Sequence, residues 1–348
     1  MNNKIRQAVI LAGGRGTRLA PFTDTNPKPM IPINGRPFME YLVELLKENG
    51  IQEIVMLLGY LPEKIKAHFG DGSKFGISIK YSVSPVEDET GTRLKKAKSL
   101  IDDKFLLMYC DNYWPLNLEK LLSFHNKQGT LASLTVYKNK DGSTKNNTFV
   151  GGNGIVSKYD RSRKDPDLNG VEIGFWILDK KVFDYFPGHN FAFMEEIQPL
   201  LVSNKELSAY QTDQKYYSIG SNERIPATEE FLKPKKIIFL DRDGVINEKR
   251  GEPGKPDYVK KWDEFKFLPG AVEAIKILND KGYEIFVVSN QPGIARGLMS
   301  EQDLKNIHEN MQKELEKQGA RLNGIYYCPH GWDEGCECRK PKPGMLLQ

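Results

Sequence analysis

Short apolar runs alternate with segments of helical periodicity in the first part of the chain. The runs 8–11 and 53–58 are almost wholly apolar, which is typical of strands buried on both faces. Between them, residues 37–49 carry apolar side chains at helical spacing, which predicts a helix facing the core. This order of strand, loop, helix and strand predicts a doubly wound α/β domain. Further strands are expected at 77–82, 104–109, 130–136 and 171–178.

The same pattern restarts after a basic cluster around Pro234. The run 237–240 is expected to form another buried strand, and Ser300 with Asp303 has the spacing of a helix cap. The sequence therefore predicts two α/β domains, residues 1–232 and residues 235–348. The elements expected in the second are a helix near 270–280, a strand at 284–289, a helix at 300–318 and a strand at 324–327.

The composition is that of a globular protein with two domains. The 348 residues are 39% hydrophobic and 28% charged, and no apolar run approaches the ~20 residues that span a bilayer. With 50 basic and 46 acidic side chains, the formal net charge is +4, which favours neither nucleic acid nor a membrane as a partner. The polar start of the chain leads straight into the first strand, so a cytoplasmic location is expected. The oligomeric state stays open.

A glycine-rich loop follows the first strand. Gly13, Gly14 and Gly16 allow a sharp turn and a close approach of the backbone to a ligand. Arg18 and, further on, Lys28 add positive charge, so the loop is suited to bind an anion such as a polyphosphate. Two familiar phosphate loops do not fit. The dinucleotide fingerprint needs a glycine where leucine stands at position 19, and the segment lacks the G-K-[ST] triplet of the Walker pattern.

The segment L-A-G-G-R-G-T-R-L, followed by P-K-P, closely resembles the signature of the sugar-1-phosphate nucleotidyltransferases. The resemblance implies a Rossmann-like, glycosyltransferase-A-like domain whose substrates are a nucleoside triphosphate and a sugar phosphate. It also implies that Arg18 and Lys28 are catalytic and neutralise the phosphates during transfer. The nucleotide-binding residues that it implies in this loop are Leu11, Ala12, Gly13, Gly14, Gly16 and Thr17.

Enzymes that transfer phosphoryl groups need a divalent cation, and a carboxylate at the end of a buried strand is a suitable ligand. Asp111 follows the strand expected at 104–109, where the resemblance places the Mg²⁺-binding aspartate. A second family aspartate is replaced here by Ser218, whose hydroxyl is a poor ligand for a hard dication. Three interpretations stay open: Asp111 and the phosphates alone hold the metal, another acid replaces the missing one, or transfer is slow.

Two further segments match the family pattern more loosely. Residues 87–92 resemble the loop that binds base and sugar, although Arg93 stands where a small residue is usual. Residues 172–174 resemble the segment that binds sugar hydroxyls. Each segment could equally be a turn or a strand end, and Lys158 is expected to be an exposed lysine. The candidates are Glu87 and Gly91 for the nucleotide, and Glu172 and Gly174 for the sugar.

Two carboxylates, Asp241 and Asp243, lie just past the strand that begins the second domain. Their spacing lets one acid attack a phosphorus atom while the other gives a proton to the leaving oxygen. The pattern D-x-D-G-V matches the haloacid dehalogenase (HAD) superfamily of phosphatases. This resemblance implies a HAD-like α/β domain in which Asp241 is the nucleophile, Asp243 is the general acid/base, and both are Mg²⁺ ligands. It further implies that Ser289 and Asn290 bind the phosphoryl group and that Lys340 balances the charge.

Cys328, His330, Cys336 and Cys338 offer three thiolates and one imidazole within a short segment. This is a full tetrahedral set for zinc with no open position, so a structural Zn²⁺ site is predicted. The cluster resembles that of the heptose-bisphosphate phosphatases and of the related histidinol phosphatases. The neighbouring segments favour the heptose enzymes, whereas the short gap before Cys336 favours the histidinol enzymes.

Together, the two resemblances predict consecutive steps on one chain. A phosphatase that removes the 7-phosphate of a heptose 1,7-bisphosphate leaves a heptose 1-phosphate, which is a suitable acceptor for a nucleotidyl group. The expected function is therefore transfer of GMP from GTP to a heptose 1-phosphate, with guanine assigned by pathway analogy alone. Because the chain stops at Gln348, the fourth acidic motif of the superfamily is missing, so a truncated chain with little phosphatase activity is expected.

Two alternatives stay open. The first is a nucleotidyltransferase for another hexose 1-phosphate, with a phosphatase domain that serves a different ester. The second is a non-catalytic sensor of a sugar nucleotide, which Ser218 and the missing fourth motif favour.

Overall fold

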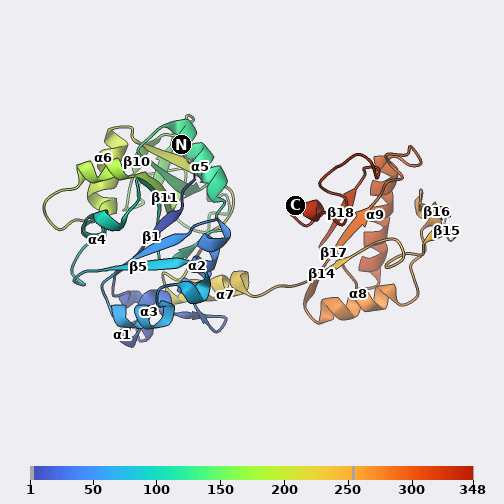
Figure 1. The fold of residues 1–348 in the computed structure, drawn as a ribbon, viewed down its shortest axis with the longest axis horizontal. Helices are drawn as coiled ribbons and strands as arrows, with labels where there is room; N and C mark the ends of the chain where they lie inside the picture. The colour runs from blue at the N-terminus through green and yellow to red at the C-terminus, as the bar shows by residue number, and fades with distance from the viewer. Residues whose placement is uncertain (1–3, 253–254, 348) are drawn as a thin grey trace. The chain divides into compact units, whose positions relative to one another are not determined.

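The computed structural model describes residues 4–252 and 255–347. The chain forms two compact units, Met1–Lys233 and Pro234–Gln348. Each unit has its own sheet and its own hydrophobic core (Figure 1). Among the helices in the described ranges, none combines the length and the apolar character needed to cross a membrane.

The first unit is built on a seven-stranded sheet in the order β12-β8-β11-β6-β1-β4-β5. Neighbouring strands are parallel except β11, which is antiparallel to both β6 and β8. The connections run to opposite sides of the β1–β6 pair, and ligands of open α/β sheets bind at such a switch point, outside the carboxyl ends of the strands. The strands are β1 (Gln7–Ala12), β4 (Glu53–Leu58), β5 (Ser78–Val83), β6 (Lys104–Tyr109), β8 (Ala132–Tyr137), β11 (Val171–Asp179) and β12 (Leu207–Thr212).

Helices cover both faces of this sheet. Ala8 and Ile10 of β1 pack in one core cluster with helix α2, whereas Val9 and Leu11 pack in the opposite cluster with helix α4. Because both faces are buried, β1 is apolar at almost every position. The helix expected at 37–49 is confirmed as α2. The helices are α1 (Phe22–Thr25), α2 (Phe38–Glu48), α3 (Pro62–Phe69), α4 (Thr90–Lys96), α5 (Leu118–Gln128), α6 (Gln198–Ser203) and α7 (Ile225–Leu232).

Short antiparallel strand pairs complete the first unit. One of them sets Ser218 opposite Asn112, the residue that follows Asp111. This pairing brings the last part of the unit to the carboxyl end of β6. The pairs are β7 (Asn112–Tyr113) with β13 (Tyr217–Ser218), β9 (Thr148–Val150) with β10 (Val156–Tyr159), and β2 (Pro32–Ile33) with β3 (Arg36–Pro37).

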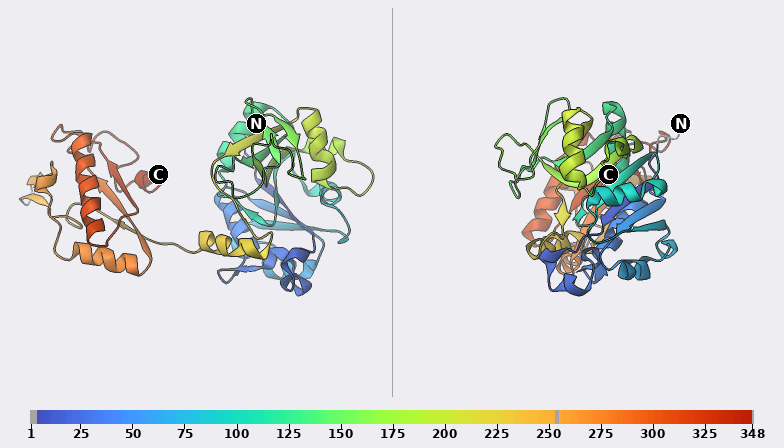
Figure 2. Two further views of the ribbon diagram at one scale, coloured as in Figure 1. Left: turned by 180° about the vertical axis from the view of Figure 1, so that it is seen from behind. Right: turned by 90° about the vertical axis from the view of Figure 1, so that its left-hand side faces the viewer.

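The second unit has a parallel sheet in the order β14-β17-β18, formed by β14 (Lys236–Leu240), β17 (Tyr283–Asn290) and β18 (Gly324–Cys328). Helices α8 (Ala271–Asp280) and α9 (Glu301–Lys317) pack in one core with this sheet (Figure 2). In that core Ile285 and Val287 of β17 join Ile307 and Met311 of α9. A separate hairpin pairs β15 (Arg250–Glu252) with β16 (Lys255–Asp257).

The start of α9 has the predicted capping box. Ser300 Oγ accepts the Asp303 backbone N–H at 3.1 Å, and the Asp303 carboxylate accepts the Ser300 backbone N–H at 3.0 Å. Two backbone donors that lack a helical partner are thus satisfied by each other's side chains. The expected elements of the second unit, helix 270–280 and strands 237–240, 284–289 and 324–327, are likewise confirmed within one residue at each end.

Candidate functional site

The glycine loop after β1 turns over the end of the sheet. Gly16 has a φ of +68°, a left-handed conformation that favours glycine, and a Cβ there would lie 2.8 Å from Lys28 Cβ. Lys28 is 9% exposed, and its ammonium donates to Asp111 Oδ2 at 2.5 Å. The fold therefore brings the predicted catalytic lysine into contact with the predicted metal-binding aspartate.

A cavity of about 440 Å³, here called the glycine-loop cavity, opens beside this ion pair. Segment 86–90 forms another part of its wall. Backbone N–H groups of a glycine loop next to two cationic side chains make a site suited to a polyphosphate. The predicted residues that line it are Leu11, Gly13, Gly14, Gly16, Arg18, Lys28, Glu87 and Asp111.

A second cavity, of about 660 Å³, shares Arg18 and Asp111 with the first and is here called the Glu172 cavity. The Glu172 carboxylate accepts the Trp176 Nε1–H at 3.0 Å and the Gly174 backbone N–H at 2.6 Å. These two donors fix the carboxylate in the wall. Because Arg18 and Asp111 line both cavities, they lie where two bound molecules would meet.

Ser218 lines the Glu172 cavity beside the backbone of Asp111. The Ile219 N–H donates to the Asp111 carbonyl at 3.0 Å, and Ser218 Oγ accepts the Gly220 N–H at 3.0 Å. The wall of this cavity thus offers the Asp111 carboxylate and the neutral hydroxyl of Ser218. Such a set fits a Mg²⁺ ion that keeps water and phosphate oxygens as its other ligands.

Some predicted residues are not part of the lining of either cavity. Gly91 has a packing role, because its N–H donates to the Phe191 carbonyl at 3.0 Å and a Cβ there would lie 2.1 Å from the Phe191 ring. Lys158 forms an ion pair with Asp165. Within the described ranges, the predicted nucleotide- and sugar-binding residues that line neither cavity are Ala12, Thr17, Gly91 and Gly174.

In the second unit, Asp241 follows β14 and meets Lys340 from the end of the chain. Lys340 Nζ lies 2.8 Å from Asp241 Oδ2 and donates to the Val288 carbonyl at 2.7 Å. Asn290 Oδ1 accepts the Lys340 backbone N–H at 3.0 Å. The structure therefore brings the predicted phosphatase residues together. A cavity of about 290 Å³ beside them is lined by Asp241, Asp243, Ser289 and Asn290, among others.

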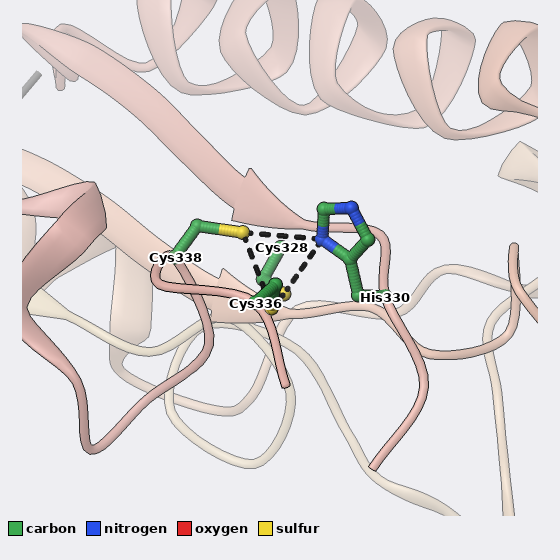
Figure 3. A group of neighbouring side chains, drawn as sticks. All are labelled: Cys328, His330, Cys336 and Cys338. Carbon is green, nitrogen blue, oxygen red and sulfur yellow. Dashed lines mark hydrogen bonds between the residues drawn. The ribbon is translucent and has the colours of Figure 1, made fainter. Parts of the chain in front are cut away.

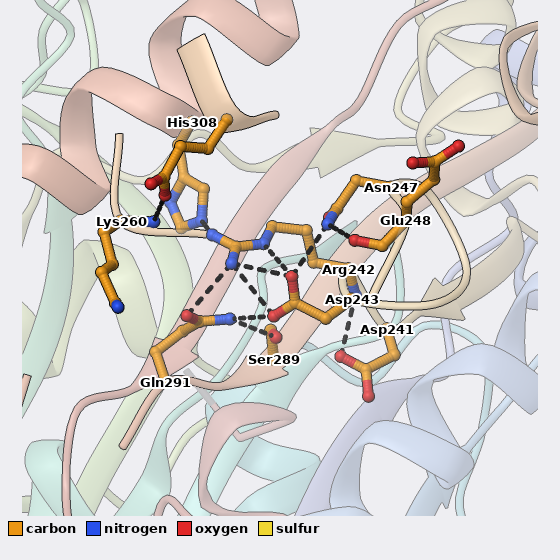
Figure 4. Close-up of polar contacts among 10 residues, drawn as sticks. Asp241, Arg242, Asp243, Asn247, Glu248, Lys260, Ser289, Gln291 and His308 are labelled. Atoms are coloured by element: carbon orange, nitrogen blue, oxygen red, sulfur yellow. Dashed lines mark hydrogen bonds and ion pairs between the residues drawn. The ribbon is translucent and has the colours of Figure 1, made fainter. Parts of the chain in front are cut away.

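A buried hydrogen-bond network holds Asp243 (Figure 4). Arg242 donates to its two carboxylate oxygens at 2.9 and 3.0 Å, while Asn247 donates at 3.0 Å and Gln291 at 2.8 Å. Burial by itself raises the pKa of Asp243, but the charge of Arg242 and the hydrogen bonds from Asn247 and Gln291 bring it below its usual value. The carboxylate is therefore ionised at neutral pH.

The four predicted zinc ligands, Cys328 at the end of β18 and three residues of the loop that follows, converge on one point (Figure 3). One ligand atom from each of Cys328, His330, Cys336 and Cys338 lies within 4.8 Å of all the others. His330 Nδ1 is 3.2 Å from Cys338 Sγ, and Cys328 Sγ is 3.6 Å from Cys336 Sγ. A Zn–S bond of about 2.3 Å implies a tetrahedral edge of about 3.8 Å. The cluster therefore has the size and donor set that suit Zn²⁺.

The sequence profile of the nucleotidyl transferase family matches residues 7–233, which is more than half of the chain. The chain belongs to the nucleotidyl transferase family. A second profile, described as polynucleotide kinase 3 phosphatase, matches residues 236–348. The nucleotidyltransferase therefore carries a C-terminal phosphatase-type domain of HAD-like fold, as the D-x-D pattern predicted.

Curated relatives of the C-terminal domain are heptose phosphatases. The D-glycero-beta-D-manno-heptose-1,7-bisphosphate 7-phosphatase of Pasteurella multocida is 47% identical over 120 residues, which are 33% of this chain and 62% of that protein. The D-glycero-alpha-D-manno-heptose-1,7-bisphosphate 7-phosphatase of Mycobacterium tuberculosis is 46% identical over 110 residues, 32% of this chain and 56% of that protein. The chain therefore spans less than two thirds of the length of each of these relatives.

Among solved structures, the first unit is similar to HddC from Yersinia pseudotuberculosis, crystallised with GMP-PN. The TM-score is 0.57 with 24% sequence identity, and the match covers 66% of this chain and 100% of that chain. This likeness concerns the fold, and it confirms the Rossmann-like nucleotidyltransferase architecture that the glycine-loop signature predicted.

Sequence reasoning missed three basic residues of the nucleotidyltransferase. Arg161, Arg163 and Arg224 line the Glu172 cavity together with Arg18. Arg161 pairs with Glu195, and Arg163 donates to a backbone carbonyl at 2.8 Å. For Arg161 and Arg163, the available signal was the R-x-R spacing that begins two residues after strand β10. This spacing places two cations near the end of one strand, where they suit an anionic substrate such as a sugar phosphate.

Glu172 is expected to make the stability of the first unit depend on pH. Burial raises the pKa of its carboxyl to about 7, against the lowering effect of the hydrogen bonds from Trp176 and Gly174. In the unfolded chain the carboxyl has the ordinary glutamate pKa of ~4.3. Its contribution to the free energy of unfolding is therefore full below that pH and is lost as the pH rises through about 7. Between about pH 5 and 8, the stability of the wild type should fall by roughly 2 kcal/mol relative to Glu172→Gln. Denaturant unfolding of both proteins measures the difference, and a difference that does not change with pH would contradict this prediction.

Proposed function

We propose that this nucleotidyltransferase transfers GMP from GTP to a heptose 1-phosphate in the cytoplasm, with Mg²⁺ as cofactor. One observation carries the proposal. The Lys28–Asp111 centre shares a chain with a domain whose curated relatives are named for heptose 1,7-bisphosphate. Removing the 7-phosphate of such a bisphosphate yields a heptose 1-phosphate, which is the kind of acceptor that a sugar-1-phosphate nucleotidyltransferase uses.

In the proposed transfer, an oxygen of the sugar phosphate attacks the α-phosphorus of the triphosphate, and the bond to pyrophosphate breaks. Arg18 lines both cavities, so its guanidinium can contact the triphosphate and the acceptor phosphate together. Lys28 adds a second cation at the glycine loop. Asp111 would hold the Mg²⁺ ion, which supplies positive charge to the phosphate oxygens when it is bound. Glu172, in the wall of the Glu172 cavity, would bind sugar hydroxyls.

In the second domain, Asp241 would attack the phosphorus of the phosphate ester, the bond to the sugar oxygen would break, and water would then hydrolyse the aspartyl-phosphate. Asp243 would be the general acid/base: because its carboxylate is ionised in the free protein, it would take up a proton when substrate binds, give it to the leaving sugar oxygen and then accept a proton from the attacking water. Ser289 and Asn290 line the cavity in which the phosphoryl group would lie. Lys340 would balance the charge on Asp241 and on that group. The zinc cluster has four protein ligands and therefore no position for substrate, so we assign Zn²⁺ a structural role there.

The test is incubation of the protein with each of the four nucleoside triphosphates, a heptose 1-phosphate and Mg²⁺, followed by measurement of pyrophosphate. Release with GTP and the heptose 1-phosphate is the expected result. Release only with a different sugar 1-phosphate would indicate a transferase for another hexose. No release with any pair would indicate a sensor of sugar nucleotides, which is the function that the neutral hydroxyl of Ser218 favours.

A further inference from the structure

Arg93 lies under the glycine loop and has no role in the transfer described above. It belongs to helix α4 and is 4% exposed, yet it lines the glycine-loop cavity. A buried arginine needs hydrogen-bond acceptors for several N–H groups and a surrounding that stabilises its charge. The partners that satisfy these N–H groups show what this residue holds in place.

The guanidinium of Arg93 links two segments of the first unit. One partner segment is the end of β4, and the other leads into the wall segment 86–90 of the glycine-loop cavity. The planar fork of arginine can bind several oxygens in fixed directions, which the ammonium of a lysine cannot do. The nearest acceptors are the Leu58 carbonyl at 3.0 Å, Ser84 Oγ at 2.9 Å, the Pro85 carbonyl at 2.8 Å and the Val86 carbonyl at 3.0 Å.

Two glycines leave room for this guanidinium. A Cβ on Gly13 would lie 2.5 Å from Arg93 Cζ, and a Cβ on Gly59 would lie 2.4 Å from Arg93 Nη1. Both separations are far below van der Waals contact. Because Gly13 begins the glycine loop, Arg93 packs directly against the backbone of that loop as well as against the end of β4.

Among residues 4–252 and 255–347, no carboxylate forms an ion pair with Arg93 at contact distance. The hydrogen-bond acceptors of Arg93 in the described part of the chain are four carbonyls and a hydroxyl, and Glu87, Asp88 and Glu89 act on it only through longer-range attraction. Asp88 pairs instead with Lys96, at 2.5 Å. Burial lowers the pKa of Arg93, but an arginine side chain stays protonated in proteins. A polyanion in the adjoining cavity would therefore be attracted by this charge.

We propose that Arg93 is a positioning residue for the nucleoside triphosphate. It holds segment 86–90 at a fixed distance from the glycine loop, and its buried charge attracts the polyphosphate. Arg93 thereby sets both the affinity for the nucleotide and the discrimination among bases. The inference rests on the proposed nucleotidyl transfer, and it concerns a residue where the family usually has a small side chain.

The test compares Arg93→Lys and Arg93→Met with the matched control Lys95→Met. Lys95 is an exposed residue of the same helix, so its replacement removes the same charge outside the cavity. The dissociation constant of each of the four Mg²⁺-bound nucleoside triphosphates is measured without acceptor. The KM of the sugar phosphate is measured separately. Binding without turnover separates this inference from the proposed function, because a wild type that binds no nucleotide would overturn that function itself.

Arg93→Met should weaken nucleotide binding about tenfold or more, and Arg93→Lys should weaken it less because the charge is kept. Both variants should lower the ratio of the affinity for the preferred nucleoside triphosphate to the affinity for the others. The KM of the sugar phosphate should stay within about twofold of the wild-type value, and Lys95→Met should match the wild type in every measurement. Unchanged nucleotide affinity and base ratio in Arg93→Lys would overturn the proposal. A rise in the KM of the sugar phosphate as large as the rise in the nucleotide dissociation constant would also overturn it, because such a result indicates that the whole site is destabilised.

A measurement on the wild type keeps the inference testable even if the variants fail to fold. Amide hydrogen exchange in peptides that cover residues 84–93 should slow when a nucleoside triphosphate binds, because the wall segment and Arg93 are then held from both sides. Sugar phosphate alone should leave this exchange unchanged. Equal exchange with and without nucleotide, under conditions where the nucleotide is bound, would count against the proposal.

Discussion

Replacing Asp111 by asparagine is expected to lower the rate of nucleotidyl transfer by about 10²–10³-fold. Asp111 follows β6, accepts the Lys28 ammonium at 2.5 Å and lines both cavities of the first unit. The amide has nearly the same shape but no charge, so it holds Mg²⁺ poorly and leaves the Lys28 charge without its partner. The measurement is pyrophosphate release at saturating concentrations of both substrates.

Asp103→Asn is the matched control for this change. Asp103 is exposed and directly precedes β6, so it lies at the opposite end of the strand from Asp111. The same chemical change there should leave turnover within about twofold of the wild type. If Asp111→Asn turned over as fast as Asp103→Asn while both remained folded, Asp111 would not be the metal-binding residue of the transfer.

Replacing Cys338 by serine should remove bound zinc and unfold the loop that follows β18. A serine hydroxyl does not replace a thiolate in a tetrahedral zinc site, and structural Zn²⁺ contributes an apparent ~10 kcal/mol or more in small zinc-binding domains. The zinc content should fall from about one ion per chain to near zero. The unfolding transition of the second unit should move to lower temperature, whereas that of the first unit should not move. Metal analysis and calorimetry measure the two effects.

Cys110→Ser is the control for the zinc experiment, because Cys110 is the one cysteine of the chain outside the cluster. It lies in the first unit, where burial raises the pKa of its thiol to about 12. This variant should retain the full zinc content. A wild-type protein purified in the presence of zinc that nevertheless held none would contradict the assignment of the cluster.

The fold was largely predictable because most of its strands are continuous apolar runs. Strand β12 is the instructive exception, since its sequence L-S-A-Y-Q-T is half polar and carries a serine, Ser208, at a buried position. Ser208 is fully buried, and its hydroxyl lies 2.7 Å from the hydroxyl of Ser133 on the neighbouring strand β8. A buried hydroxyl is tolerated when it is hydrogen-bonded. That partner comes from a distant part of the chain, so local hydropathy could not indicate the strand.

The candidate site was predictable only in part. The motif pattern singled out Arg93 as unusual, but nothing in the local sequence indicated that its guanidinium would lie against Gly13 and Gly59. Ser218 was likewise recognised as a departure from the family, whereas its position opposite Asn112 follows from the pairing of β13 with β7. Arg224, whose local sequence pattern is ordinary, became a candidate only because it lines the same cavity as Asp111.

The sequence by itself determined the features whose residues are close together in the chain. The glycine loop, the Asp241–Asp243 pair and the cysteine–histidine cluster are of this kind, because short spacing limits where such side chains can point. The tertiary structure alone decided which of these groups meet. Lys28 and Asp111 are in contact although 83 positions of sequence separate them. Lys340 and Asp241 are in contact although one lies near the last residue of the second unit and the other near its first. Those contacts depend on the order of strands in each sheet, which is set by long-range packing and not by any local pattern.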